Sequence, residues 1–256
     1  MPFRRLQSKL LKDRAMRRSS LLRSHLPETR PYHPYVLRRM LNQHSTVFVK
    51  PDKGSQGRGI VRLKRIKNRG VHISWGLNNR KVNRKFMIRL LHQRLRPYQS
   101  YLVQQGLRLT KYHNRLIDIR VFLQRPGSKW LISGKVVRVG AAGRFVTNYS
   151  QGGRPVHLPK VLNSIYHHNP GKVQATIQKV DQVAYHAAAA LNRKFPGIRV
   201  LGIDIGLDRS GRIWIIEANT RPGTQLFKNL GDKSMYQTIV TRRQIIDHKN
   251  EGRRRR

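Results

Sequence analysis

The chain carries, at residues 200–219, the stretch VLGIDIGLDRSGRIWIIEAN, in which two apolar segments flank a short polar turn. Apolar and β-branched residues on both sides of that turn predict a β-hairpin. Each segment contains one carboxylate, Asp204 in the first and Glu217 in the second, and pairing of the two strands makes these side chains neighbours. Asn219 follows Glu217 at i+2 and therefore faces the same side of the sheet.

Acidic residues are scarce in this chain, which makes a carboxylate inside an apolar segment informative. Lysine and arginine total 54, aspartate and glutamate total 11, and the net charge is +43. A buried carboxylate is costly unless it is paired or binds a cation. Asp204, Glu217 and Asn219 offer the oxygen donors that suit Mg²⁺ held jointly with phosphate. The alternative is a carboxylate paired with one of the many arginines.

A third carboxylate, Asp118, lies in the apolar segment at residues 116–121, with Arg120 at i+2 on the same face. Two interpretations are open at this point. The pair could be an ion pair within one strand, or the arginine could reach a phosphoryl group during its transfer.

Composition narrows the classes of protein that remain. A length of 256 residues allows one large domain or two small lobes, and 38% hydrophobic content permits a core. The absence of cysteine excludes disulfides, thiolate zinc sites and cysteine nucleophiles, and it fits a reducing cytoplasm. No apolar run is long enough to span a bilayer, and the first 26 residues have no secretory signal pattern.

The excess of basic residues predicts attraction to polyanions, such as nucleic acid, acidic polypeptide or an anionic surface polymer. A basic surface that only keeps the protein soluble is the alternative. Nucleic-acid binding would be nonspecific, because no recognition motif such as a helix-turn-helix is visible.

Patterns of apolar residues predict two mixed lobes and an α+β class. We expect a basic N-terminal arm at 1–26, a connector and first lobe at 27–105, a second lobe at 106–249 and a basic tail at 250–256. Expected strands lie at 46–50, 60–66, 70–75, 101–105, 118–123, 130–139, 200–207 and 212–217. Expected helices lie at 35–41, 82–95, 172–195 and 232–247, and the arm carries a partial apolar stripe at Leu6, Leu10, Leu11, Leu21 and Leu22.

Lys50 ends the first expected strand, and glycines follow it at positions 54, 57 and 59. Glycines let backbone N–H groups approach phosphate oxygens, and the lysine adds a positive charge. The order of residues is not that of the P-loop, in which the lysine follows the glycines. An ordinary hairpin turn is the alternative.

Seven short motifs, taken in order, give the chain a resemblance to the ATP-grasp superfamily, and within it to the YheC/YheD-like, spore-coat-associated group. The motifs are FVKP with GSQGRGI at residues 48–60, YLVQQG at 101–106, DIRV at 118–121, VRVG at 137–140, VTNYSQGG at 146–153, GIDI at 202–205 and EANTRPG at 217–223. The resemblance implies two α+β lobes with ATP between them.

The resemblance also implies roles for individual residues. Those expected to hold ATP are Lys50, Gly54, Ser55, Gln56, Gly57 and Gly59 at the phosphates and Gln104 and Gln105 beside the adenine. Asp204, Glu217 and Asn219 would hold Mg²⁺, and Arg120, Arg138 and Asn148 would face the transferred phosphate. In this family a second nucleotide lysine often lies upstream of the Lys50 strand, where this chain offers Arg38 and Arg39.

The implied activity is ligation of a carboxylate and an amine through an acyl phosphate, here on an anionic substrate, in the cytoplasm or at the spore or cell envelope. Phosphoryl transfer needs positioning and charge neutralisation and no side-chain nucleophile, which agrees with the lack of cysteine. The alternative is a protein that keeps the fold without turnover and binds polyanions as a coat component.

Overall fold

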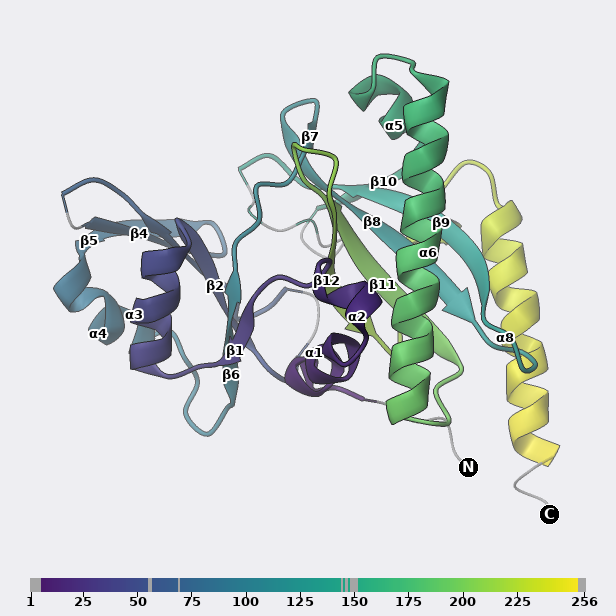
Figure 1. The fold of residues 1–256 in the computed structure, drawn as a ribbon, viewed down its shortest axis with the longest axis horizontal. Helices are drawn as coiled ribbons and strands as arrows, with labels where there is room; N and C mark the ends of the chain where they lie inside the picture. The colour runs from purple at the N-terminus through teal and green to yellow at the C-terminus, as the bar shows by residue number, and fades with distance from the viewer. Residues whose placement is uncertain are drawn as a thin grey trace.

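The computed structural model, which describes residues 6–54, 57–68, 70–143, 145, 147 and 152–252, shows two α+β lobes side by side (Figure 1). Each lobe is built on a mainly antiparallel sheet with helices packed against it. The expected α+β class is confirmed. No helix among the described residues is long and apolar enough to cross a membrane.

The first lobe has the strand order β1-β6-β2-β3-β4-β5. Its elements are β1 (Thr29–Pro31), α3 (Pro34–Gln43), β2 (Thr46–Pro51), β3 (Val61–Arg65), β4 (Gly70–Trp75), β5 (Asn78–Asn83), the 3-10 turn η1 (Arg84–Phe86), α4 (Met87–His92) and β6 (Tyr101–Gln105). Alternation along β2 buries Val47 and Val49 against α3 and α4 and turns Phe48 and Lys50 to the opposite face. That opposite face looks toward the second lobe.

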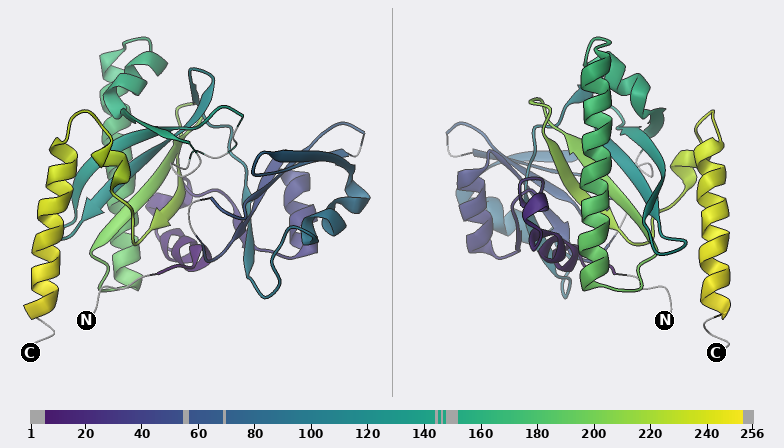
Figure 2. Two further views of the ribbon diagram at one scale, coloured as in Figure 1. Left: turned by 180° about the vertical axis from the view of Figure 1, so that it is seen from behind. Right: turned by 45° about the vertical axis from the view of Figure 1, so that its right-hand side comes forward.

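The second lobe has the strand order β10-β9-β8-β11-β12, with β7 paired to the end of β8. Its elements are β7 (Lys111–Tyr112), β8 (Arg115–Gln124), β9 (Leu131–Val139), β10 (Arg154–His157), α5 (Leu158–Ile165), α6 (Pro170–Lys194), β11 (Val200–Leu207), β12 (Ile213–Asn219), α7 (Gln225–Lys228) and α8 (Ser234–Gly252). The 25-residue α6 covers one face of the sheet, and α8 lies along the other side of the lobe (Figure 2).

Most expected elements are present, with some differences. The helix expected at 82–95 is shorter, because Asn83 caps a 3-10 turn that leads into α4, and Val82 belongs to β5. The elements that were not expected are the strands β1, β5, β7 and β10 and the helices α5 and α7. Trp75 and Trp214 lie in strands as predicted, and Trp130 precedes β9.

The segment expected to be a basic arm folds into α1 (Lys9–Arg17) and α2 (Ser20–Arg23). Ser8 caps α1 by accepting a hydrogen bond from Leu11 N. The predicted apolar stripe is wrong in part: Leu11 and Leu21 are 45% and 59% exposed, whereas Ala15, Met16 and Leu22 enter the core of the second lobe. The segment is therefore part of the second lobe's core.

This packing can be tested with two neighbouring leucines of α2. Leu22 is fully buried, so Leu22→Ala is expected to lower the free energy of unfolding by about 2–5 kcal/mol through lost burial and a cavity. Leu21→Ala, at an exposed position, is expected to change it by less than about 0.5 kcal/mol. Urea denaturation measures both variants, and equal small effects would mean that α2 does not pack in solution.

Candidate functional site

A cleft lies between the lobes, where β2 and β6 of the first lobe face β8, β9, β11 and β12 of the second. Its cavity has a volume of about 120 Å³. One part of its lining is apolar and comprises Phe48, Ile60, Leu107, Leu109, Leu116 and Ile216. The other part carries charge and comprises Lys50, Asp118, Arg138, Asp204 and Glu217. Such a division suits a ligand with one apolar planar end and one anionic end.

The charged part is organised by a buried network of two aspartates and two arginines. Arg120 donates to both oxygens of Asp204, at 2.5 and 3.1 Å, and Arg138 donates to both oxygens of Asp118, at 2.6 and 2.7 Å. Arg138 also reaches Asp204 at 2.9 Å and so links the two pairs. Thr147 donates a short hydrogen bond to Asp118.

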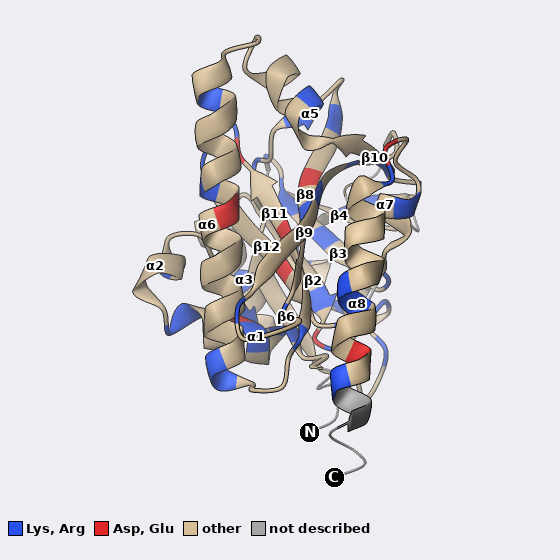
Figure 3. Ribbon diagram, turned by 90° about the vertical axis from the view of Figure 1, so that its right-hand side faces the viewer, with Lys and Arg blue, Asp and Glu red and all other residues tan. Residues whose placement is uncertain are grey.

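These contacts exclude one of the two interpretations of Asp118 and Arg120. The strand register places Asp118 opposite Arg138 and Asp204 opposite Arg120. Each pair therefore crosses between neighbouring strands, and the ion pair within one strand does not form. Figure 3 shows acidic positions on the central strands and also on α6 and α8, with Lys and Arg on both helices and strands.

The network fixes the protonation of Asp204 and Arg138. Burial alone would raise the pKa of Asp204, but the charges of Arg120 and Arg138 outweigh it and hold that pKa below its usual value. Burial would lower the pKa of Arg138, and Asp118 and Asp204 reverse this and raise it. The Asp204 carboxylate and the Arg138 guanidinium are therefore charged at neutral pH.

Lys50 faces this network from the first lobe. Its Nζ donates to Oε1 of Gln104 at 2.6 Å and lies 5.4 Å from the centre of the Phe48 ring. Burial in the cleft lowers the pKa of Lys50 to about 8, although Glu217 opposes that shift. An anion bound beside the Lys50 ammonium group would stabilise its positive charge, as water does for an exposed lysine.

Two further lysines reach the site, and the sequence did not single them out. Lys9 and Lys12, at i and i+3 on α1, line a small cavity together with Lys50 and Glu217. Lys9 donates to the carbonyls of Pro51 and Gly54, at 3.1 and 3.0 Å, and its Nζ lies 3.8 Å from Glu217. Arg38 and Arg39, offered for the second nucleotide lysine, lie exposed on α3 instead.

Lys12 is 4% exposed, and its ammonium group makes no hydrogen bond or ion pair with a described residue. Burial lowers its pKa, and attraction to Glu217 opposes the shift. One sequence signal could have identified both lysines: Ser8 is a typical helix cap, and a helix that begins after it places residues 9 and 12 on the same face. The general excess of basic residues in this segment hid that signal.

The three glycines that follow Lys50 have backbone conformations that favour glycine. The φ angles of Gly54, Gly57 and Gly59 are 145°, 70° and 72°, values that residues other than glycine rarely adopt. A Cβ atom on Gly59 would also lie 3.0 Å from Cγ of Pro51. Ser55 and Gln56, expected at the phosphates, and Asn148, expected at the transferred phosphate, lie outside the described residues.

Gln104 and Gln105 both line the cleft, but their side chains serve different contacts. Gln104 donates to Oγ1 of Thr29 at 3.2 Å and accepts from Lys50, so both ends of its amide are hydrogen-bonded. Oε1 of Gln105 accepts from the backbone N–H of Glu28 at 3.1 Å. The Gln105 side chain therefore ties the connector to the end of β6.

The oxygen donors expected to hold Mg²⁺ come from one hairpin. Asp204 lies directly opposite Glu217, and Asn219 is two residues further along β12. The Glu217 side chain is 32% exposed, and its one polar contact with the described residues is the long one with Lys9. Oδ1 of Asn219 accepts from Arg221 N at 2.9 Å. No cluster of three or more His, Cys, Asp or Glu occurs among the described residues. Two carboxylates and an amide nevertheless match the donor chemistry of Mg²⁺, which takes its remaining ligands from phosphate and water.

Solved structures of similar fold are ATP-grasp ligases. An L-amino acid ligase from Bacillus licheniformis matches with a TM-score of 0.56 and 12% identity, over 93% of this chain and 47% of that one. The D-alanine-D-alanine ligase from Coxiella burnetii matches with a TM-score of 0.54 and 13% identity, over 97% of this chain and 59% of that one. A third match is N5-carboxyaminoimidazole synthase from Aspergillus clavatus, in complex with ADP and 5-aminoimidazole ribonucleotide. Its TM-score is 0.53 and its identity 15%, over 86% of this chain and 46% of that one. The architecture is thus that of an ATP-grasp protein.

The family is defined more closely by the sequence. The chain belongs to the YheC/D-like ATP-grasp family, whose model matches residues 5–245. Two endospore coat-associated proteins of Bacillus subtilis are relatives: YheD is 26% identical over 219 residues, 79% of this chain and 47% of YheD, and YheC is 25% identical over 214 residues, 81% of this chain and 58% of YheC. The chain spans about half the length of these curated relatives.

The pKa of Lys50 predicts how nucleotide binding changes with pH. Because Lys50 loses its positive charge above a pKa of about 8, affinity for Mg-ADP is expected to fall as the pH rises from 7 to 9. Lys50→Arg stays charged across that range and is expected to flatten the profile. Isothermal titration calorimetry at fixed ionic strength measures both proteins, and an equally steep fall in the variant would assign the dependence to another group.

Proposed function

We propose that this chain is an ATP- and Mg²⁺-dependent ligase that activates a carboxylate as an acyl phosphate and joins it to an amine. The observation that carries the proposal is the convergence of Lys50, Arg138, Asp204 and Glu217 on one end of the cleft, where Arg120 and Arg138 both pair with Asp204. Adenine would lie among the apolar residues and the triphosphate against the charged ones. The ligase fold of similar structures supports the same activity.

The residues of the chain would perform the chemistry by positioning and by charge. Lys50, Lys9 and Lys12, which line one small cavity, would hold the phosphates. Arg120 and Arg138 would neutralise the transferred phosphoryl group, because phosphate oxygens offer these guanidinium groups acceptors in place of Asp204.

Asp204, Glu217 and Asn219 would hold Mg²⁺, which would offset the negative charge of the phosphates. The cation would compensate Glu217, which lies at the cleft with little pairing of its own. No side chain needs to act as a nucleophile, because the substrate carboxylate would attack the terminal phosphate and release ADP, and the amine would then attack the acyl phosphate and release inorganic phosphate.

The anionic substrate and the place of action belong to the same proposal. The charge of +43 exceeds what ATP requires and favours a substrate with many carboxylates. The lack of cysteine suits the cytoplasm, and the two coat-associated relatives support a role at the developing spore.

The experiment is Mg-ATP binding and ADP release by single variants of the hairpin carboxylates. Asp204→Asn and Glu217→Gln are each expected to weaken Mg-ATP binding by roughly 10- to 100-fold, the range found when groups that support a bound metal are removed. Asp247→Asn, an exposed carboxylate on α8, is the matched control and should bind as the parent does. Parent-like affinity in both hairpin variants would contradict the proposal.

A second candidate function is polyanion binding without turnover, and the net charge favours it. That function predicts binding to an acidic polymer that falls steeply with salt and is the same in Glu217→Gln as in the parent. A parent protein that binds the polymer but releases no ADP with any carboxylate–amine pair would support this candidate over the ligase.

A further inference from the structure

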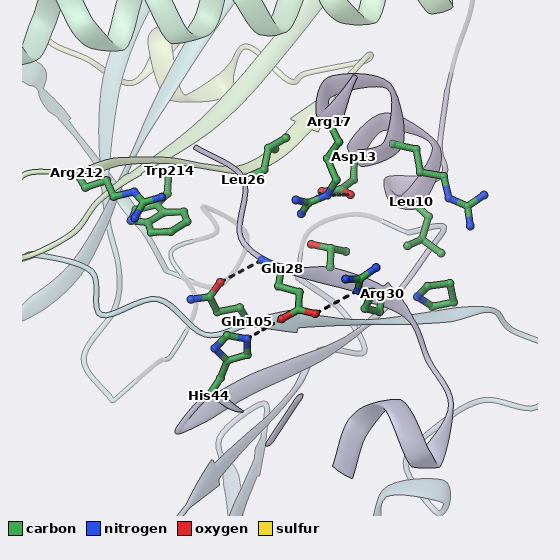
Figure 4. Close-up of a pocket in the computed structure, with 13 residues that line it drawn as sticks. Leu10, Asp13, Arg17, Leu26, Glu28, Arg30, His44, Gln105, Arg212 and Trp214 are labelled. Carbon is green, nitrogen blue, oxygen red and sulfur yellow. Dashed lines mark hydrogen bonds and ion pairs between the residues drawn. The ribbon is translucent and has the colours of Figure 1, made fainter. Parts of the chain in front are cut away.

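A second cavity, of about 480 Å³, lies outside the nucleotide cleft, where α1, residues 26–31 and β12 come together (Figure 4). Its wall is drawn from both lobes, with Glu28 and Arg30 beside the first lobe's sheet and Trp214 on β12. Gln105 lines both this cavity and the nucleotide cleft. A ligand in the second cavity would therefore lie next to Gln105, which also borders the nucleotide cleft.

The wall of this cavity has an excess of positive charge. Four arginines line it (Arg14, Arg17, Arg30 and Arg212) against two carboxylates (Asp13 and Glu28). Both carboxylates are already paired: Asp13 accepts from Arg17 at 2.6 Å, and Glu28 contacts Arg30 at 3.2 Å and His44 at 2.9 Å. The charge that remains uncompensated in the wall is cationic.

Three of the arginines can offer N–H groups to an incoming anion. Arg30 contacts Glu28 through Nε, and its side chain is 55% exposed. Arg14 is exposed and makes no hydrogen bond or ion pair with a described residue. The Arg212 guanidinium lies 3.9 Å from the centre of the Trp214 ring and donates to the Ser24 carbonyl from Nε and Nη2. Apolar groups of Leu10, Leu26 and Pro31 lie between these charges. The wall thus suits a carboxylate carried on a short hydrocarbon chain.

The second cavity also leads toward the charged end of the nucleotide cleft. Three residues, Asp13, Leu26 and Thr29, line both this cavity and the small cavity that contains Lys12 and Glu217. An extended ligand held by the arginines would therefore approach the site where the phosphate is transferred.

We propose that this cavity binds an acidic peptide segment, whose side-chain carboxylates pair with Arg14 and Arg30 and which supplies the carboxylate substrate. The proposal rests on the proposed function, since it names the class of one substrate. A peptide fits better than nucleic acid, because bases bind proteins by stacking on aromatic rings. Trp214 is 8% exposed and is covered by Arg212, and His44 carries the one other aromatic ring among the described residues of the wall.

The test uses a fluorescein-labelled hexaglutamate peptide and measures its fluorescence anisotropy with the full chain at fixed ionic strength. Arg14→Glu and Arg30→Glu are each expected to raise the Kd by about tenfold or more, because a like charge then faces the peptide. The matched control, Arg89→Glu on α4, lines no part of the cavity and is expected to change the Kd by less than about twofold. Thermal denaturation checks that each variant is folded, and Arg14→Gln, at an exposed position, provides a milder variant.

Mg-ATP binding is measured in the same samples, which separates this proposal from the proposed function. Peptide affinity that is unchanged in both charge-reversal variants would overturn the site, as would an oligothymidylate of equal charge that competes equally and loses affinity in the same variants. Glutarate that displaces the peptide at equal concentration would overturn the choice of a peptide. A parent protein that binds Mg-ATP but no peptide would overturn this site alone, and one that binds the peptide but no Mg-ATP would overturn the proposed function alone.

Discussion

The buried network that joins Asp118, Arg138, Asp204 and Arg120 across β8, β9 and β11 is the interaction on which the site depends. Breaking a buried pair by removing one partner typically costs about 3–5 kcal/mol, because the charge left behind has no compensation. The network therefore constrains the register of three strands as well as the positions of two guanidinium groups. The same contacts that hold the sheet together aim positive charge at the cleft, so stability and the proposed phosphoryl chemistry share their residues.

The N-terminal helix α1 gives the small cavity that contains Lys50 and Glu217 a wall that belongs to neither sheet. Its backbone is held to the first lobe through Asp52, which accepts from Leu10 N at 2.8 Å, and its Ala15 and Met16 enter the core of the second. Residue Leu6 exchanges hydrogen bonds with Thr220 just beyond β12. Because α1 contacts both lobes, Lys9 and Lys12 are placed between them, where a movement of the lobes would change their distance to Glu217.

The sequence predicted the features that depend on local pattern. The hairpin at 200–219 forms with Asp204 opposite Glu217, and Lys50 points into the cleft because alternation along β2 buries Val47 and Val49. The family and the fold followed from the ordered motifs. The partners of the aspartates could not be predicted, since each arginine is equally basic and only strand register selects Arg138 for Asp118. Lys9 and Lys12 were missed for a related reason: their place at the cleft results from contacts far apart in the chain.

The central claim is that one end of the cleft between the lobes is a Mg²⁺–triphosphate site. A crystal structure with Mg²⁺ and a nonhydrolysable ATP analogue tests it most directly. The account predicts phosphate oxygens on Lys50 and Arg138, a cation bound by Asp204 and Glu217, and adenine among Phe48, Ile60 and Ile216. A nucleotide bound elsewhere, or bound in the cleft with its phosphates directed away from Asp204 and Glu217, would contradict it.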